Sequence, residues 1–290
     1  MKHSRTVADL IRKHFESLTK KERHFANFLL ENYPVSCMGT ITKIAHNANV
    51  STPTVMRMVK KIGFDGFSDF QTAVRVEVED QMSRPITEHN RWSESASDEH
   101  ILNTFADAIV DNLRQSLMHI DPSMFDAIVE ALSNDKKQLF IAGGRITSSL
   151  AQYLATHLQV ARKNVTLLPA SASAWPHYLL DMEKGHILFV FDMRRYEQTL
   201  ISLVEVARER GVEVVLVTDQ WASPAAKFAR YVFNLRIEAP SCWDSSVVPL
   251  FLIESLIAAV QDKTWKATKK RIDDMEDLFD QTKLFKKFNL

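Results

Sequence analysis

The spacing of apolar residues divides the chain into a helical head and a body in which strands alternate with helices. From Thr6 to about Met82, apolar residues recur three or four positions apart, as in amphipathic helices. From Glu99 onward, short runs that are apolar almost throughout alternate with helical segments. Such runs are typical of strands buried on both faces of a sheet, and they lie at 138–142, 165–168, 186–191, 212–218 and 231–237. The sequence therefore predicts an all-α N-terminal bundle and a C-terminal three-layer α/β domain with a five-stranded parallel sheet of the flavodoxin or Rossmann type.

The same pattern predicts four segments. They are a helical domain at 1–82, a linker at 83–98, an α/β domain at 99–262 and a C-terminal amphipathic helix at 263–290. The linker is predicted because its residues are mostly polar, with four serines and one proline, and follow no sustained period. In the tail, apolar residues such as Trp265, Ile272 and Phe279 recur at helical spacing. A packing helix is favoured over a membrane-surface helix because the polar face is mixed in sign.

Charge is distributed unevenly along the chain although it sums to zero. Residues 1–62 hold 11 Lys and Arg against 4 Asp and Glu, whereas residues 63–262 hold 17 against 27. A basic head on an acidic body is typical of a nucleic-acid-binding domain joined to a separate sensing domain.

Other features narrow the class of protein. Apolar residues make up 46% of the chain and charged residues 25%, as in ordinary globular proteins, and no apolar run is long enough to span a membrane. The N-terminus lacks the pattern of a secretion signal. Cys37 and Cys242 lie in different predicted domains and are expected to be reduced thiols. We therefore expect a cytoplasmic protein without a membrane partner.

The segment from Thr40 to Gly66 predicts a helix, a short turn and a second helix. Thr40 can cap the first helix, and Ser51 can cap the second, which has Pro53 in its first turn. The inward stripe of the second helix is Val55, Met58, Val59 and Ile62. The residues expected to face outward, towards DNA, are Ser51, Thr52, Thr54, Arg57, Lys60 and Lys61, with Thr40 beside them. A polar helix face of this kind reads the major groove, where arginine can bind guanine and lysine can bind phosphates. The alternative is a helical bundle used only for protein contacts.

Two loops of the α/β domain predict an anion site. Ligands of an open parallel sheet bind beyond the carboxyl ends of its strands. After the first strand, Gly143 and Gly144 permit close backbone approach, and Arg145, Ser148 and Ser149 follow them. After the third strand come Asp192, Arg194, Arg195 and Thr199, where the two arginines suit a phosphate or a carboxylate. Solvated arginines or a salt bridge remain the alternative. Asp244 and Ser245 can close the pocket or cap the following helix.

The motifs LTKKERHFANFLLENY and ITKIAHNANVSTPTVMRMVKKIGFDGFSDF, with the α/β domain that follows, resemble the RpiR-type (MurR/RpiR) family of bacterial regulators. The likeness covers about residues 5–262, and the run from Gly63 to Phe70 is its most specific part. It implies a helix-turn-helix domain joined to a sugar-isomerase (SIS) domain. It also implies a regulator of a metabolic operon that binds a palindromic site in double-stranded DNA as a homodimer or homotetramer and responds to a small effector.

The resemblance also bears on the ligand. SIS domains use serines matching Ser148 or Ser149 to hold a phosphosugar. The sugar-phosphate members carry a Ser-x-Ser-Gly-x-Thr-like loop where this chain has Asp192 to Thr199, and of that loop only Thr199 matches. A sugar phosphate, an acidic sugar and another organic acid therefore all stay open as the effector.

An enzyme is the second hypothesis: a sugar-phosphate isomerase with an accessory helical domain. Its general base would be Glu254, His177 or His157. The histidines are scattered without metal-ligand spacing, and the glycines match neither a P-loop nor a GxGxxG motif. We therefore expect no metal, no cofactor and no catalytic residue.

Overall fold

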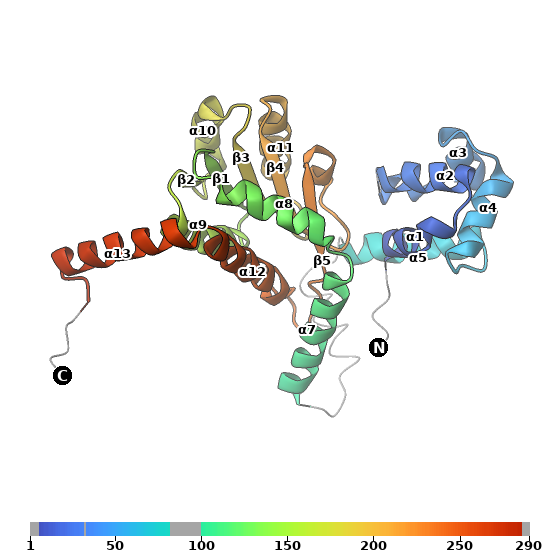
Figure 1. The fold of residues 1–290 in the computed structure, drawn as a ribbon. Coiled ribbons are helices and arrows are strands. Elements are labelled where there is room, and N and C mark those ends of the chain that lie inside the picture. The colour runs from blue at the N-terminus through green and yellow to red at the C-terminus, as the bar shows by residue number, and fades with distance from the viewer. Residues whose placement is uncertain (1–5, 32, 82–99, 286–290) are drawn as a thin grey trace.

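The computed structural model describes residues 6–31, 33–81 and 100–285 (Figure 1). The predicted linker at 83–98 lies outside these residues. The N-terminal domain is helical, with three-residue 3-10 turns after α1 and α2. Its helices are α1 (Val7–His14), α2 (Lys20–Glu31), α3 (Ile41–Asn47), α4 (Thr52–Lys61) and α5 (Phe67–Gln81). No helix among the described residues is long and apolar enough to cross a membrane.

The bundle forms because each helix contributes one apolar stripe to a common core. Phe25 and Leu29 of α2, Ile44 of α3 and Val55 of α4 are among the buried residues of that core. The predicted inward stripe of α4 is confirmed, because Val55, Met58, Val59 and Ile62 are all buried. Helix starts are set by side chains: Thr40 accepts a hydrogen bond from the backbone N–H of Lys43 at the start of α3.

The C-terminal domain is the predicted three-layer α/β fold. Two helices, α7 (Ile101–Leu117) and α8 (Pro122–Ser133), precede the first strand. The strands are β1 (Leu139–Gly143), β2 (Val165–Leu167), β3 (Ile187–Phe191), β4 (Glu213–Asp219) and β5 (Tyr231–Leu235). They pair in parallel in the order β2-β1-β3-β4-β5. This order reverses between β1 and β3, which places the switch point of the fold there.

Helices cover both faces of the sheet (Figure 1). On one face α8, α9 (Ser148–Ala161) and α12 (Val247–Lys263) pack on side chains such as Ile141 and Phe189. On the other face α10 (Trp175–Asp181), α11 (Gln198–Glu209) and the 3-10 helix Pro224–Phe228 pack on Phe140 and Leu188. Strand residues are buried on both sides, which explains why the sequence shows continuous apolar runs rather than alternation. The chain continues into α13 (Trp265–Thr282).

Candidate functional site

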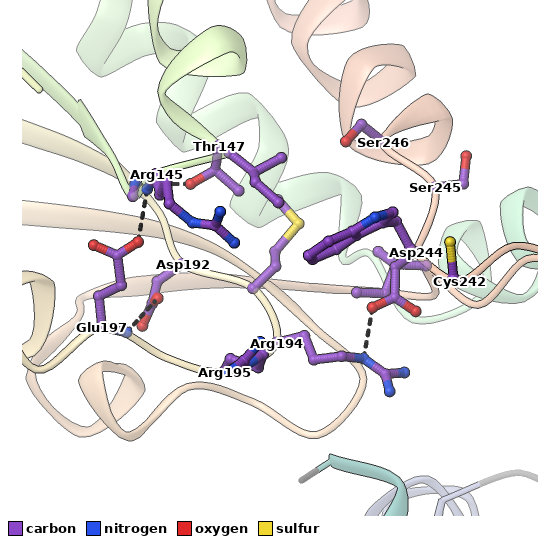
Figure 2. A pocket seen from close by; sticks show the side chains of 15 residues that line it. Arg145, Thr147, Asp192, Arg194, Arg195, Glu197, Cys242, Asp244, Ser245 and Ser246 are labelled. Carbon is purple, nitrogen blue, oxygen red and sulfur yellow. Dashed lines mark hydrogen bonds and ion pairs between the residues drawn. The ribbon is translucent and has the colours of Figure 1, made fainter. Parts of the chain in front are cut away.

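A cavity of about 400 Å³ opens at the carboxyl end of the sheet, beside the β1/β3 switch point (Figure 2). Its walls come from the β1–α9 loop, the β3–α11 loop and the segment between β5 and α12. The lining residues are Gly144, Arg145, Ile146, Thr147, Asp192, Met193, Arg194, Arg195, Glu197, Ile237, Cys242, Trp243, Asp244, Ser245 and Ser246. A volume of this size can hold a small metabolite, and the loops that follow the parallel strands surround the cavity.

The first wall is built around the carboxylate of Glu197. Its Oε1 accepts a hydrogen bond from the backbone N–H of Arg145 over 2.6 Å. It also lies so close to Gly144 that a Cβ atom there would be 2.4 Å away. Thr147 fixes the loop from the other side, since its hydroxyl accepts from Gly144 N and donates to the carbonyl of Phe191. An internal carboxylate thus occupies one N–H of the glycine loop, which a bound anion would otherwise use.

The second wall is the segment that begins at Asp192 and contains Arg194. Arg194 has φ 25° and Arg195 has φ 63°, both in the sparsely populated positive-φ region. The backbone N–H of Arg194 donates to Asp219 over 2.6 Å. Its guanidinium lies 4.3 Å from the ring centre of Trp221, and its Nε is 2.5 Å from Oδ2 of Asp244 (Figure 2). Arg194 therefore ties the β3–α11 loop to the segment before α12 across the cavity.

Two buried carboxyl groups, those of Asp192 and Asp219, hold this wall in place. Asp192 accepts from the hydroxyl of Ser223 and from the backbone N–H of Glu197. Burial raises the pKa of Asp192 to about 6, although the hydrogen bond from Ser223 opposes the shift. Burial also raises the pKa of Asp219, against the hydrogen bonds from Arg194 and Tyr196. The loop thus rests on two carboxyl groups that burial makes harder to ionise, and Asp192 has a pKa of about 6.

The structure brings most of the residues expected at the ligand site together. Gly144, Arg145, Asp192, Arg194, Arg195, Asp244 and Ser245 all line the cavity. Gly143, Ser148, Ser149 and Thr199 do not line it, and their contact with a ligand stays a prediction. The hydroxyls of Ser148 and Ser149 donate instead to the carbonyls of Arg145 and Ile146, within the same loop.

Other lining residues were not anticipated. Glu197 and Trp243 are the most informative of them, because one occupies the glycine loop and the other lies under the guanidinium of Arg145 at 5.8 Å. The remaining ones are Ile146, Thr147, Met193, Ile237, Cys242 and Ser246. Trp243 and its neighbours lie in a loop that the sequence does single out, but no pattern in the sequence reports that Glu197 folds back on Gly144.

The candidate DNA-binding surface is the exposed face of α4. Ser51, Arg57 and Lys60 are exposed, and α4 lies on the far side of the helical domain from the sheet (Figure 1). Ser51 occupies the N-cap position, but its hydroxyl bonds the hydroxyl of Thr54 over 2.9 Å rather than a backbone N–H. Thr52 is partly exposed, and Thr40 is exposed at the start of α3.

Two residues of the expected DNA face have a different environment. Thr54 was expected to face outward, but its side chain is only 1% exposed, and it packs beneath Ser51. Lys61 is exposed in part, yet its ammonium is 2.7 Å from the carboxylate of the buried Glu22 in α2. Lys61 therefore joins α4 to α2 within the domain.

The candidate bases of the enzyme hypothesis lie outside the cavity. Glu254 is exposed on α12 and accepts a hydrogen bond from the hydroxyl of Tyr153 over 2.9 Å. The ring of His157 packs on Tyr153, and His177 is exposed on α10. None of these three residues is among those lining the cavity.

Two family models match the chain in the order the structure shows. Residues 5–81 match the helix-turn-helix domain of the rpiR family, and residues 132–259 match the SIS domain. Together they cover all five strands of the sheet and every helix from α1 to α5.

Several known proteins are similar to this chain along most of its length. The regulator RpiR of Escherichia coli K12 is 24% identical over 78% of this chain and 75% of its own, and HexR of the same organism is 24% identical over 80% and 78%. The solved structure of Vibrio vulnificus NanR complexed with ManNAc-6P has the same fold, with a TM-score of 0.56 at 21% identity over 95% of this chain and 98% of that one. This chain therefore belongs to the RpiR-type family of transcriptional regulators, in which an rpiR-family helix-turn-helix domain is joined to a SIS domain.

Proposed function

We propose that the protein regulates a metabolic operon by binding double-stranded DNA through α4, under the control of a small anionic ligand held in the SIS-domain cavity. The observation that carries the ligand class is the presence of Arg145, Arg194 and Arg195 around one cavity of about 400 Å³. Arginine forks bind carboxylates and phosphates bidentately. A sugar phosphate, an acidic sugar or an organic acid fits this chemistry.

The carboxylates in the cavity have internal partners, which favours an anion over a cation as ligand. Asp244 is paired with Arg194, and Glu197 accepts from Arg145 N. The Arg145 side chain, in contrast, extends over Trp243 towards the middle of the site (Figure 2). The likeness to Vibrio vulnificus NanR supports the same ligand class, since that protein was solved in complex with ManNAc-6P, an anionic sugar derivative.

The DNA-binding half of the proposal is tested by fluorescence anisotropy with labelled DNA from upstream of the protein's own gene. Arg57→Ala is expected to weaken specific binding about tenfold or more, because one bidentate base contact contributes about 1–3 kcal/mol. The matched control is Lys136→Ala, which removes one exposed positive charge from the SIS domain. Specific binding that is the same in wild type and Arg57→Ala would contradict the role given to α4.

The ligand half is tested by thermal shift with three probes: a hexose 6-phosphate, a hexuronate and citrate. At least one probe is expected to raise the melting temperature of the wild type. Arg195→Ala is expected to remove that shift, and the exposed Arg208→Ala on α11 is expected to keep it. A shift that persists in Arg195→Ala would place the anion elsewhere. Under the proposal, the ligand changes the packing of subunits and so the spacing of two α4 helices on a palindromic operator.

A further inference from the structure

Helix α13 extends beyond the α/β body that supports its first turns. Thr268 is fully buried, and Arg271 Nη2 donates to the carbonyl of Gln159 in α9 over 2.7 Å. After Ile272 the helix continues to Thr282, and Figure 1 shows no other described element beside that part. Contacts with this chain's own body therefore account for only the first half of α13.

An apolar stripe follows the whole length of α13. Trp265, Ile272 and Phe279 are spaced by seven residues, so they lie along one side of the helix, next to the side that carries Thr268. Trp265 is 58% exposed, and Ile272 and Phe279 are each partly exposed. The ring of Phe279 packs on that of Phe285, which is 64% exposed and extends the apolar surface at the end of the helix. Large apolar side chains that are exposed together mark a surface that a partner covers.

The charges on α13 are separated into two blocks. All basic residues come before Ile272, namely Lys266, Lys269, Lys270 and Arg271. All acidic residues come after it, namely Asp273, Asp274, Glu276, Asp277 and Asp280. A helix alone is stabilised by the reverse order, with acidic residues near its N-terminus and basic residues near its C-terminus. The stability of the isolated helix therefore does not explain this arrangement.

A second copy of α13, running antiparallel, complements both the apolar stripe and the two charge blocks. The basic half of each helix then lies against the acidic half of the other, and the apolar stripes face each other. A parallel pair would instead place like charges together. Such self-complementarity is what a two-fold symmetric contact requires, since each surface patch must fit itself.

We propose that α13 pairs antiparallel with α13 of a second copy of this chain, through the side that carries Trp265, Ile272 and Phe279. In the heptad set by these residues, Lys269 and Glu276 occupy the same flanking position. The two-fold axis brings Lys269 of each copy opposite Glu276 of the other, so this ion pair forms twice. The pairing gives the proposed oligomer an interface, and it depends on neither the ligand nor the DNA site.

Sedimentation velocity of the full chain at low micromolar concentration tests the pairing. Lys269→Glu replaces each ion pair by two facing carboxylates, so the dissociation constant for self-association is expected to rise about tenfold or more. The double variant Lys269→Glu/Glu276→Lys restores opposite charges only in the antiparallel arrangement and is expected to regain wild-type association. The matched control is Lys184→Glu, an equal charge change at an exposed site after α10.

Each remaining outcome counts against the pairing. A wild type that is monomeric throughout would overturn it, and so would a Lys269→Glu variant that associates like Lys184→Glu. A double variant that stays as weak as the single one would exclude the antiparallel register. Circular dichroism melts of all four proteins verify folding, and a chain ending at Lys263 gives an independent comparison, because it lacks α13 and is expected to lose the association.

Discussion

Arg236, directly after β5, donates a hydrogen bond from its Nη2 to Oδ2 of Asp9 in α1 over 2.9 Å, which joins the SIS domain to the helix-turn-helix domain. Both side chains are buried, and the backbone N–H of Arg236 donates to the hydroxyl of Ser116 in α7. The next residue, Ile237, lines the cavity. The contact between domains is therefore one residue away from the wall of the proposed ligand site.

Removing one partner of this pair is expected to destabilise the protein strongly. Arg236→Met removes the closest guanidinium from the buried carboxylate of Asp9, which keeps the guanidinium of Arg12 at 3.6 Å. The expected loss is therefore about 2–3 kcal/mol, below the cost of leaving a buried charge with no partner. Urea denaturation measures the loss. The matched control is Arg230→Met, which breaks the ion pair between Arg230 and Glu213. The Arg230 side chain is 56% exposed, so this variant is expected to lose less than about 1 kcal/mol of stability. Equal losses in the two variants would show that the interdomain pair is not buried in solution.

Lys61→Met is expected to reduce stability because it leaves Glu22 buried without its ammonium partner. Burial raises the pKa of Glu22, but the hydrogen bonds from Lys61 and Thr19 outweigh it, and the net pKa is below the ordinary 4.5. A lowered carboxyl pKa adds stability above about pH 4.5 and loses it as the pH falls through the folded-state pKa. The loss measured by urea denaturation is expected to be about 1–2 kcal/mol at pH 7, and smaller at pH 3.

Lys60→Met is the control for that measurement. Lys60 is the neighbouring exposed lysine of α4, and its removal is expected to change stability by less than about 0.5 kcal/mol. For DNA binding we expect the reverse order. Lys60→Met should weaken binding more than Lys61→Met, because the ammonium of Lys60 is the one that can reach phosphates. A Lys61→Met protein as stable as Lys60→Met would refute the structural role of Lys61.

The sequence predicts the fold and the general place of the site, and particular residues show why it stops there. Continuous apolar runs such as the one that became β3 identify buried parallel strands, and strand order then fixes where loops meet. From the sequence Thr54 is predicted to be a polar surface residue, because helical periodicity carries no information about the hydrogen bond between its hydroxyl and that of Ser51. Glu197 was missed for a related reason, since its partner Arg145 is far away in sequence. Contacts between distant loops depend on backbone conformation, which composition and spacing do not report.

Gly143→Ala and Gly144→Ala are expected to have different effects although the residues are adjacent. A Cβ at Gly143 would lie 2.5 Å from the backbone oxygen of Thr147, which cannot move without displacing the start of α9. A Cβ at Gly144 would meet only the end of the flexible Glu197 side chain. We expect a loss of about 2–4 kcal/mol for Gly143→Ala and about 1 kcal/mol or less for Gly144→Ala, measured by urea denaturation. Gly144→Ala should instead alter binding of the anionic probes, since it displaces the carboxylate from Arg145 N. The reverse order of stabilities would contradict the loop geometry.

Asp192 is expected to give the protein a pH-dependent stability near neutrality. Burial raises the pKa of Asp192 to about 6 from its ordinary 3.8, so the folded protein holds this proton more tightly than the unfolded chain does. For a carboxyl group with a raised pKa, the stabilising contribution is present at low pH and is lost as the pH rises from about 3.8 to about 6, by up to about 3 kcal/mol. Asp192→Asn keeps an acceptor for Glu197 N and carries no charge. Its free energy of unfolding should therefore lack this fall and exceed that of the wild type at pH 7.5, whereas the exposed Asp126→Asn should follow the wild type. Chemical denaturation at half-unit steps from pH 4 to 7.5 measures the difference, and curves for wild type and Asp192→Asn that stay parallel over this range would show that the buried carboxyl group does not titrate there.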